Sequence, residues 1–432
     1  MENSKALPLL FSVILFSTLT GCGLQGCGNQ EQVCDSDSIV SHTVDTALVG
    51  RLTDFVAQKN RFADEQLCLS VFDLTVDTAI FKLHGGRLIA PASCLKLLTA
   101  VAALKSMGMD YEYRNRLSLL GENQHGVFYG TVFLRMDDDP LFESFSGFVQ
   151  ALRDEGIRRI EGEILFDLTR TDTLKAHPSA AVWDIPYHKL PLLLKGEQRV
   201  KQEFLYQLSA AGITFRQNPL FADPNIAAYD PASTPFLSRL ATDMSESRAR
   251  TLAEENHRLT DVVTPMLLNS SNIKADALLW HLNHVYGRMC EGNVLHAFLK
   301  YQLGIDYSTS SLVINDGSGL SPDNRLTADF LVQLLRYTYQ QKPIFQYFID
   351  EALPTPAGGE RCGSLTSRMA GTPCVGRVFC KTGTLVTIGG SGLAGYAKGA
   401  NGHWYAFAIL NIDTPVADAR IFQDKFCTEL VK

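Results

Sequence analysis

Apolar and polar positions alternate near both ends of the chain, and a helical run follows the first alternating segment. From Leu67, LCLSVFDLTVDTAIFKLHGGRLI alternates around a turn and predicts a β-hairpin. Residues 93–107 have the length and apolar content of a buried helix. Residues 376–412 predict a strand, a glycine-rich connection and two strands joined by a turn at Asn401-Gly402.

The middle of the chain has a different pattern of apolar and polar residues. YEYRNRLSLLG followed by GVFYGTVFLRM predicts another pair of strands. Beyond them the chain mixes short helices such as FESFSGFVQALRDEGI with strand-like segments such as IEGEILFDL. The charged stretch 245–261 is expected to form the solvated face of a helix.

This change of pattern predicts the domain organisation. Residues 41–112 and 262–432 share a similar pattern of predicted helices and strands, and they flank a segment with a different pattern, residues 113–261. The chain has 432 residues, of which 46% are hydrophobic, so it is long enough to bury sizeable cores. We expect one domain formed by the two flanking regions and interrupted by an inserted domain.

The first residues predict export. Residues 6–20 form an uncharged apolar run that is short for a membrane span and ends in small residues, as signal peptides do. The segment LTGC, which ends at Cys22, resembles the bacterial lipobox, where the signal is cut before a lipid-bearing cysteine. We expect a signal peptide at 1–21, a polar tether at 22–40, and a periplasmic or cell-envelope protein anchored to the membrane by lipid on Cys22. A plain cleaved signal is the alternative.

Charge and metal-ligand spacing exclude other function classes. The formal net charge is −7 and no basic run occurs, which argues against nucleic acid as a partner. His281 and His284 form a close pair without an evident third ligand, and no Cys-x-x-Cys spacing is present. We therefore expect neither a metal site nor a cofactor.

Ten cysteines in an exported chain permit disulfides. Three lie close enough in sequence for a local bridge, although spacing does not fix the pairing: Cys362, Cys374 and Cys380. Three others are expected to be buried thiols: Cys68, Cys94 and Cys290.

A serine and a lysine three residues apart open the predicted helix at 93–107. On a helix this spacing places both side chains on one face, so the amine of Lys96 can reach the hydroxyl of Ser93. A serine hydroxyl needs a base to become a good nucleophile. Lowering the pKa of lysine from about 10.4 to about 7 costs roughly 4.6 kcal/mol, which burial and a second cation can supply. A serine N-cap is the structural alternative.

FCKTGTL supplies that second cation. Lys381 offers a positive charge for an anionic group, Gly383 lets a ligand backbone approach a strand, and the Thr382 and Thr384 hydroxyls offer donors. An exposed edge-strand lysine beside a turn is the alternative.

MLLNSSNIKADALL contains a third candidate at a helix start. Ser270 can relay a proton or bond to Lys96, and the side-chain amide of Asn272 can hold a substrate carbonyl. An N-cap is the alternative, because Ser-Ser-Asn is a good capping sequence. Each motif has a structural explanation of its own, but the three in this order do not share one.

The ordered set Ser-x-x-Lys, Ser-x-Asn, Lys-Thr-Gly resembles the signature of the penicillin-recognising serine enzymes. RLIAPASCLKLLTAVAAL, INDGSGLSPDNRLTADFLVQLL and GTPCVGRVFCKTGTL narrow the match. They closely resemble the class C low-molecular-mass penicillin-binding proteins, the D-alanyl-D-alanine carboxypeptidase/endopeptidase family of serine peptidases. The resemblance covers nearly everything from Val262 to Asp413 and is strong at the nucleophile helix.

The resemblance implies a fold and a role for each motif. The fold is an α/β (α+β) transpeptidase-like domain, similar to β-lactamases, with an antiparallel sheet covered by helices and interrupted by an inserted domain. Ser93 would be the acylated nucleophile and Lys96 its base. Ser270 and Asn272 would relay the proton and hold substrate, and residues 381–384 would bind substrate. Backbone N–H groups of Ser93 and near Thr384 would form the oxyanion hole.

Two features depart from the family pattern. The family usually has Gly-Asp-Pro-Thr where this chain has Asp138-Asp139-Pro140-Leu141, and the stretch between Ser93 and Ser270 is shorter than expected. The loop DGSGLS, 316–321, lacks the context of a phosphate-binding loop, and the resemblance places it beside the active site.

The sequence thus predicts a serine D-alanyl-D-alanine carboxypeptidase or endopeptidase. It would act on peptidoglycan stem peptides through an acyl-enzyme, and β-lactams, which mimic the peptide, would acylate it as inhibitors. Two alternatives remain open. One is a β-lactamase, although no obvious glutamate motif for rapid deacylation is present. The other is a non-catalytic penicillin-binding or scaffolding lipoprotein, which would not need a nucleophile and a base together.

Overall fold

The structure, a computed structural model, describes residues 43–181, 184–216, 248–287, 293–356 and 361–432. The predicted signal peptide, Cys22 with its tether, and Cys290 lie outside these described residues. Within them, no helix has both the length and the apolar character needed to cross a membrane.

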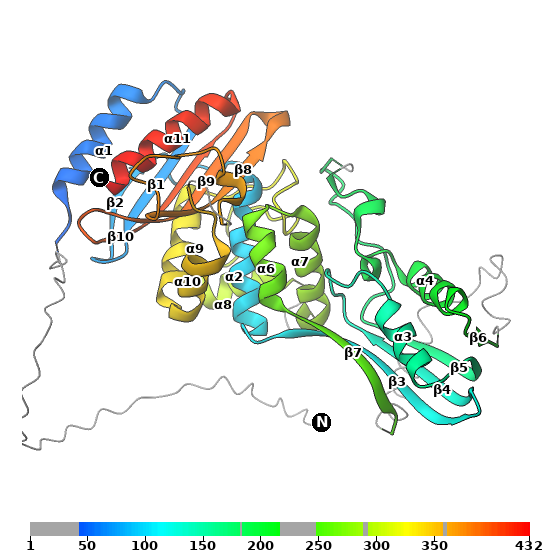
Figure 1. The fold of residues 1–432 in the computed structure, drawn as a ribbon. Helices are drawn as coiled ribbons and strands as arrows, with labels where there is room; N and C mark the ends of the chain where they lie inside the picture. Colours follow the sequence, from blue (N-terminus) through cyan, green and yellow to red (C-terminus); the bar gives the residue numbers. More distant parts are fainter. Residues whose placement is uncertain (1–42, 182–183, 217–247, 288–292, 357–360) are drawn as a thin grey trace, which may run out of the picture. The chain divides into compact units, whose positions relative to one another are not determined.

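A five-stranded antiparallel sheet joins the two ends of the chain, in the order β2-β1-β10-β9-β8 (Figure 1). The strands are β1 (Leu67–Asp73), β2 (Thr78–Leu83), β8 (Val378–Leu385), β9 (Gly390–Lys398) and β10 (Trp404–Asn411). The predicted N-terminal hairpin and the three C-terminal strands are confirmed. Because β1 pairs with β10, the first and last parts of the chain form one sheet, and β8 is left at its edge.

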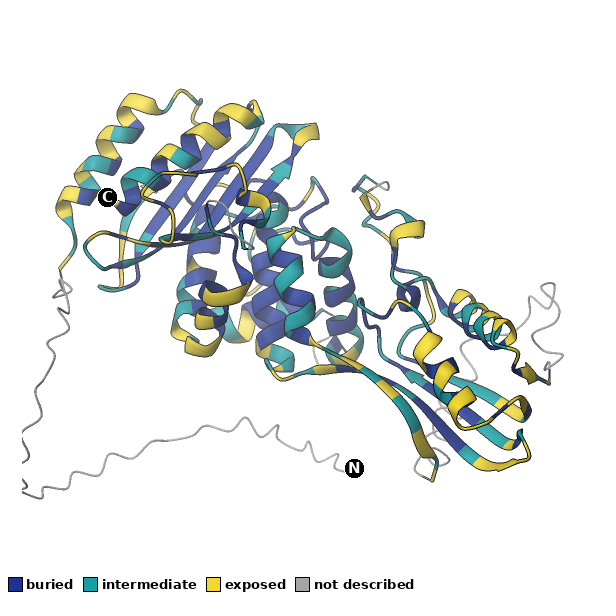
Figure 2. Cartoon of the chain, in the orientation of Figure 1, coloured by how far each residue is buried: buried dark blue, intermediate teal, exposed yellow. Residues whose placement is uncertain are grey.

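Helices cover both faces of this sheet, and their apolar sides form two separate cores (Figures 1 and 2). On one face lie α1 (Thr46–Lys59) and α11 (Val416–Val431). On the other face, α9 (Ala328–Gln340) contacts β1, β9 and β10 and joins the larger core. The predicted fold class, an antiparallel sheet covered by helices, is confirmed.

Helix α2 (Lys96–Met107) lies at the centre of the larger core. Every residue from Lys96 to Leu104 is buried, because the sequence is apolar on all sides except for Lys96 and Thr99. Three helices contact it, α6 (Leu259–Leu268), α7 (Asn272–Tyr286) and α8 (Val294–Leu303), and α10 (Lys342–Tyr347) joins the same core. A helix buried on every side is fixed firmly, which holds the residues at its N-terminus in place.

A second five-stranded sheet forms between these two parts of the chain, in the order β6-β5-β4-β3-β7. Its strands are β3 (Glu112–Gln124), β4 (Val127–Met136), β5 (Arg159–Leu168), β6 (Thr214–Phe215) and β7 (Arg250–Arg258). Strands β4, β5 and β6 pair in parallel, and the other pairs are antiparallel. Helices α3 (Ser146–Asp154) and α4 (Glu197–Ala210) pack on this sheet. The predicted strand pair after α2 is confirmed as β3 and β4.

The charged stretch 245–261, predicted to be helical, is mostly strand β7. It pairs antiparallel with β3, so that Glu112 lies opposite Arg258. Leu252 packs against the core of the second sheet, and the Arg116 guanidinium forms an ion pair with Glu254 across the two strands. The prediction was wrong because pairing with a distant strand outweighs the helical propensity of glutamate, alanine and arginine.

Asp139, in the segment that departs from the family pattern, is buried and bonded on several sides. Its carboxylate accepts hydrogen bonds from the Leu141 N–H at 2.9 Å and from the Asn115 side-chain amide at 2.8 Å. His257 Nδ1 lies 2.7 Å from the same carboxylate. The aspartate therefore ties the turn after β4 to β3 and β7.

The described cysteines on the first sheet and beside it are buried. Cys374 and Cys380 are free thiols, so the possible local bridge between them is absent. Cys68 and Cys94 are also buried free thiols, as predicted. Burial raises the pKa of the Cys68 thiol to about 11, so it stays protonated at neutral pH.

Candidate active site

Ser93 lies on a tight turn in front of α2. The 3₁₀ turn η1 spans Ala92–Leu95, and the α-helix begins only at Lys96, so Ser93 is not the N-cap of the predicted helix. Ala92, just before the serine, has a positive φ of 48°. A non-glycine residue in this region is strained and marks a position that the surrounding structure fixes. Ser93 is partly exposed, whereas Cys94 and Leu95 after it are fully buried.

Two glycines let neighbouring segments press against this turn. A Cβ on Gly319 would lie only 1.9 Å from the Ala92 carbonyl oxygen. A Cβ on Gly383 would lie 2.9 Å from the Pro91 carbonyl oxygen and 3.1 Å from the Ser93 nitrogen. Strand β8 and the loop 316–321 therefore touch the nucleophile turn through backbone, which only glycine permits.

The amine of Lys96 makes three short contacts. Its Nζ lies 2.8 Å from Ser93 Oγ, 2.7 Å from Asn272 Oδ1 and 2.6 Å from the Ser318 carbonyl oxygen. The side chain is fully buried. The structure thus brings together three predicted residues, Ser93, Lys96 and Asn272, from distant parts of the sequence.

Burial, together with the nearby Lys381 ammonium, lowers the pKa of Lys96. Three groups oppose this shift: Asp276, Asp316 and Cys94. Lys381 is itself fully buried, and burial lowers its pKa to about 8. A lysine with a lowered pKa beside a serine hydroxyl is the arrangement that general-base catalysis requires.

Asp276 and Ser318 were not found by sequence analysis. Asp276 on α7 is buried and accepts hydrogen bonds from the Gly317 N–H at 2.9 Å and the Ser318 hydroxyl at 3.0 Å. It thereby holds the loop whose Ser318 carbonyl accepts from Lys96. Burial and the neighbouring Asp316 raise the pKa of Asp276. The loop 316–321, placed beside the active site by resemblance, does contact Lys96.

Ser270 and Asn272 lie where α6 gives way to α7. Ser270 has a positive φ of 57° and makes no side-chain hydrogen bond within the described residues. The cap of α7 is Ser271, whose hydroxyl accepts from the Lys274 N–H at 3.3 Å. Ser271 is therefore the N-cap of the helix, and Ser270 and Asn272 do not cap it. The side-chain carbonyl oxygen of Asn272 instead accepts a hydrogen bond from Lys96.

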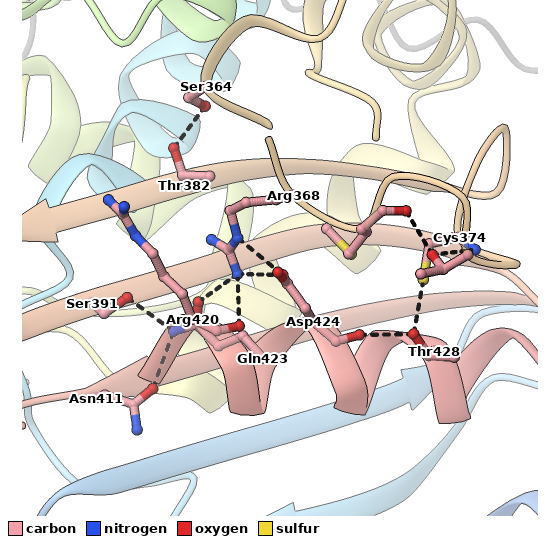
Figure 3. Close-up of polar contacts among 12 residues, drawn as sticks. Ser364, Arg368, Cys374, Thr382, Ser391, Asn411, Arg420, Gln423, Asp424 and Thr428 are labelled. Atoms are coloured by element: carbon pink, nitrogen blue, oxygen red, sulfur yellow. Dashed lines mark hydrogen bonds and ion pairs between the residues drawn. The ribbon is translucent and has the colours of Figure 1, made fainter. Parts of the chain in front are cut away.

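Residues 381–384 lie on β8, the edge strand. Lys381 and Gly383 are buried on the side of the nucleophile turn, and the Lys381 Nζ donates to the Thr382 carbonyl oxygen at 2.8 Å. Thr382 and Thr384 alternate with them and are half-buried. The Thr382 hydroxyl donates to Ser364 Oγ at 2.7 Å (Figure 3). An edge strand leaves alternate backbone groups unpaired by a neighbouring strand, and these can bind an extended peptide.

Comparison with known families shows to which family the chain belongs. The model of the D-Ala-D-Ala carboxypeptidase 3 (S13) family matches residues 48–189 and 238–427. The chain belongs to this family. It is a class C low-molecular-mass penicillin-binding protein and a peptidase, as the sequence motifs predicted.

One relative and two solved structures resemble this S13 chain. It is 24% identical over 423 residues to the D-alanyl-D-alanine carboxypeptidase of Actinomadura sp. (strain R39), covering 78% of this chain and 77% of that one. Penicillin-binding protein 4 (dacB) of Haemophilus influenzae shares the fold at a TM-score of 0.67 and 17% identity, covering 88% and 99% of the two chains. The predatory endopeptidase Bd0816 of Bdellovibrio bacteriovorus gives a TM-score of 0.53 at 16% identity, with 85% and 92% covered.

Proposed function

We propose that this S13 chain is a serine D-alanyl-D-alanine carboxypeptidase/endopeptidase that acts through an acyl-enzyme on Ser93. The contacts of Lys96 carry the proposal. A neutral amine has two N–H donors and one lone pair. Two of the three contacts, Asn272 Oδ1 and the Ser318 carbonyl, are acceptors, and they take the two donors. The lone pair is then left for the Ser93 hydroxyl, 2.8 Å away.

The chemistry follows from that geometry. The Ser93 hydroxyl gives its proton to Lys96 Nζ while Oγ bonds to the carbonyl carbon between two D-alanines. The C–N bond then breaks, the proton passes to the amine of the leaving D-alanine, and an ester on Ser93 remains. We assign the proton relay to Ser270, which lies two residues before Asn272 and makes no side-chain hydrogen bond of its own within the described residues. Water hydrolyses the ester and regenerates the serine.

Strand β8 supports the binding of the substrate backbone. The strand is at the edge of its sheet, and Gly383 places it against the Ser93 nitrogen. The Ser93 N–H and an N–H near Thr384 would donate to the oxyanion that forms on the attacked carbonyl, a contribution worth about 3–4 kcal/mol per donor in comparable enzymes. The amide nitrogen of Asn272, whose oxygen faces Lys96, would donate to another carbonyl of the peptide.

β-Lactams fit the same site, because they present a carbonyl and a carboxylate as the terminal dipeptide does. Another structure of Haemophilus influenzae penicillin-binding protein 4 was determined in complex with a β-lactam. The substrate class places the enzyme in the cell envelope, where peptidoglycan lies, and the predicted lipid on Cys22 would anchor it to a membrane.

Labelling with a fluorescent penicillin tests the proposal. The full-length protein should retain the label as a mass increase on one serine, and Ser93→Ala should remove it. Ser209→Ala, an exposed serine on α4, is the matched control and should label normally. Release of D-alanine from a synthetic pentapeptide should show the same dependence on Ser93. Rapid turnover of the drug would instead indicate a β-lactamase, and no labelling a non-catalytic binder.

A further inference from the structure

The terminal carboxylate of the substrate needs a cationic partner, and Lys381 is poorly placed to provide one. Its side chain is fully buried, and its Nζ donates to the Thr382 carbonyl oxygen. A buried ammonium can act on Lys96 through its charge, but a ligand on the outer side of β8 cannot reach it. A cation that contacts the carboxylate directly would therefore come from another element. This inference rests on the proposed function.

Arg420 provides an exposed guanidinium at that position. It lies in the first half of α11, and its Nη2 donates to the Thr384 Oγ1 at 3.0 Å. Thr382 and Thr384 are two residues apart on β8 and so point to the same side of the strand. Two hydroxyls and a guanidinium therefore meet beside the strand that touches Ser93.

Arg368, the neighbouring arginine, is already paired with a carboxylate. It is buried, and its guanidinium donates to the Asp424 carboxylate at 2.6 Å and to Gln423 Oε1 at 3.0 Å (Figure 3). Arg420 is exposed, and among the described residues no carboxylate pairs with it. Its positive charge is therefore still available for an anionic ligand.

The backbone that carries Arg420 is held rigidly. Buried Gln423, one turn further along α11, donates to Ser391 Oγ and to Asn411 Oδ1, both at 3.1 Å. Arg368 also contacts the Arg420 carbonyl oxygen at 3.4 Å. Helix α11 is thus fixed to β9 and β10, so only the side chain of Arg420 has to move to bind a ligand.

We propose that Arg420, together with the Thr382 and Thr384 hydroxyls, binds the free carboxylate of the substrate's terminal D-amino acid. The Thr384 hydroxyl receives the guanidinium when no substrate is bound and keeps it beside the strand. Arginine is suited to this task because its planar fork can bind a carboxylate through two hydrogen bonds. Arg420 is then a specificity-determining residue that selects peptides with a free terminus.

The test compares two peptides that differ only at the terminus: an acyl-D-alanyl-D-alanine and its C-terminal amide. For the full-length protein, Arg420→Ala should lower kcat/KM for the free acid about 10- to 100-fold, the effect of a lost charge-assisted hydrogen bond. The amide should lose at most about twofold. Arg420→Lys should fall between, because it keeps the charge and loses the fork. Lys425→Ala removes an exposed positive charge from the same helix and should leave both peptides unaffected.

A binding measurement separates this inference from the proposed function. Chains that carry Ser93→Ala, with and without Arg420→Ala, are titrated with both peptides by calorimetry. Preferential binding of the acid that disappears with Arg420→Ala supports the carboxylate site even if the wild-type protein cleaves neither peptide. Equal losses for acid and amide, or no loss for the acid, overturn it while leaving acylation of Ser93 intact.

Discussion

The charge state of Lys96 depends on the groups packed around its amine. Burial and the Lys381 ammonium lower its pKa, and the Asp276 carboxylate raises it. Acylation needs the neutral amine, so the rate should rise with pH through the pKa of Lys96 and level off above it. The two neighbours of opposite charge therefore allow this pKa to be moved in either direction.

Lys381→Gln should move the acidic limb of the acylation profile to higher pH. Removing a nearby positive charge makes protonation of Lys96 easier, so a smaller fraction is neutral at a given pH. We expect the rate of penicillin acylation at pH 7 to fall at least about 10-fold, because a close like charge shifts a pKa by a unit or more. Rates measured from pH 5 to 10 would show much of the loss recovered at the alkaline end.

Asp276→Asn is the control of opposite sign. The amide can keep the hydrogen bond from the Gly317 N–H, while the negative charge that favours protonated Lys96 is lost. The acidic limb should move to lower pH. If both variants moved the limb in the same direction, the charge of Lys96 would not control acylation.

At the residue scale, the sequence was enough to identify the side chains whose types are common in catalytic sites. Ser93, Lys96 and Asn272 form a single cluster of hydrogen bonds. Ser318 contributes a backbone carbonyl, and a backbone group carries no signature in the sequence. Arg420 belongs to a helix near the C-terminus, and no motif in the surrounding sequence distinguishes it from the other arginines of the chain.

At the scale of elements, the contact between β8 and the nucleophile turn η1 controls where Ser93 lies. Gly383→Ala would place a Cβ 2.9 Å from the Pro91 carbonyl oxygen and 3.1 Å from the Ser93 nitrogen. The turn must then shift by a fraction of an ångström or more. We expect penicillin acylation to fall about 100-fold, because a displacement of about 1 Å in a reacting group has an effect of this size.

Gly390→Ala on β9 is the matched control for that substitution. Its Cβ would come no closer than 3.4 Å to another atom, and its φ is ordinary. It should label at close to the wild-type rate, with a melting temperature near that of Gly383→Ala. A Gly383→Ala protein that labels normally would show that the β8 contact does not position the serine.

Strand β7 shows where pattern analysis of elements reaches its limit. Its residues are charged and rich in helix formers, and although half-buried and exposed positions alternate over residues 253–258, none is fully buried. What makes them a strand is the partner β3, whose register is not visible from local sequence. The strands β1, β2, β9 and β10 were predictable because alternation or a turn at Asn401-Gly402 marks them locally.

At the scale of the whole molecule, the two sheets are built from different stretches of the chain, and the division into a catalytic and an inserted domain stays a prediction. Strand β3 begins at Glu112 and β7 ends at Arg258, and these two residues lie opposite each other. The strands that leave and re-enter the first part of the chain thus run side by side. Sequence texture suggested an insert at 113–261, but it gave no information on strand order or on the parallel pairing of β4 with β5.

Anchoring is a property of the whole chain that sequence alone predicts. Cys22→Ser should shift the protein, expressed in a bacterial host, from the detergent phase to the aqueous phase, because no lipid can be attached. Penicillin labelling should be unchanged. Cys27→Ser changes the next cysteine of the tether and should stay in the detergent phase. A Cys22→Ser protein that remains with detergent would contradict lipid attachment at this residue.

Cys94 follows the reactive serine directly, yet it takes no part in the chemistry described above. Its sulfur lies behind β8, with Sγ donating to the Lys381 carbonyl oxygen at 3.5 Å, and burial raises its pKa to about 12. A thiolate is intrinsically a stronger nucleophile than a hydroxyl. Without this burial, the Cys94 sulfur would compete with the Ser93 oxygen for each electrophile. The fold thus makes the choice between oxygen and sulfur, and alkylating reagents such as iodoacetamide should leave Cys94 unmodified until the chain unfolds.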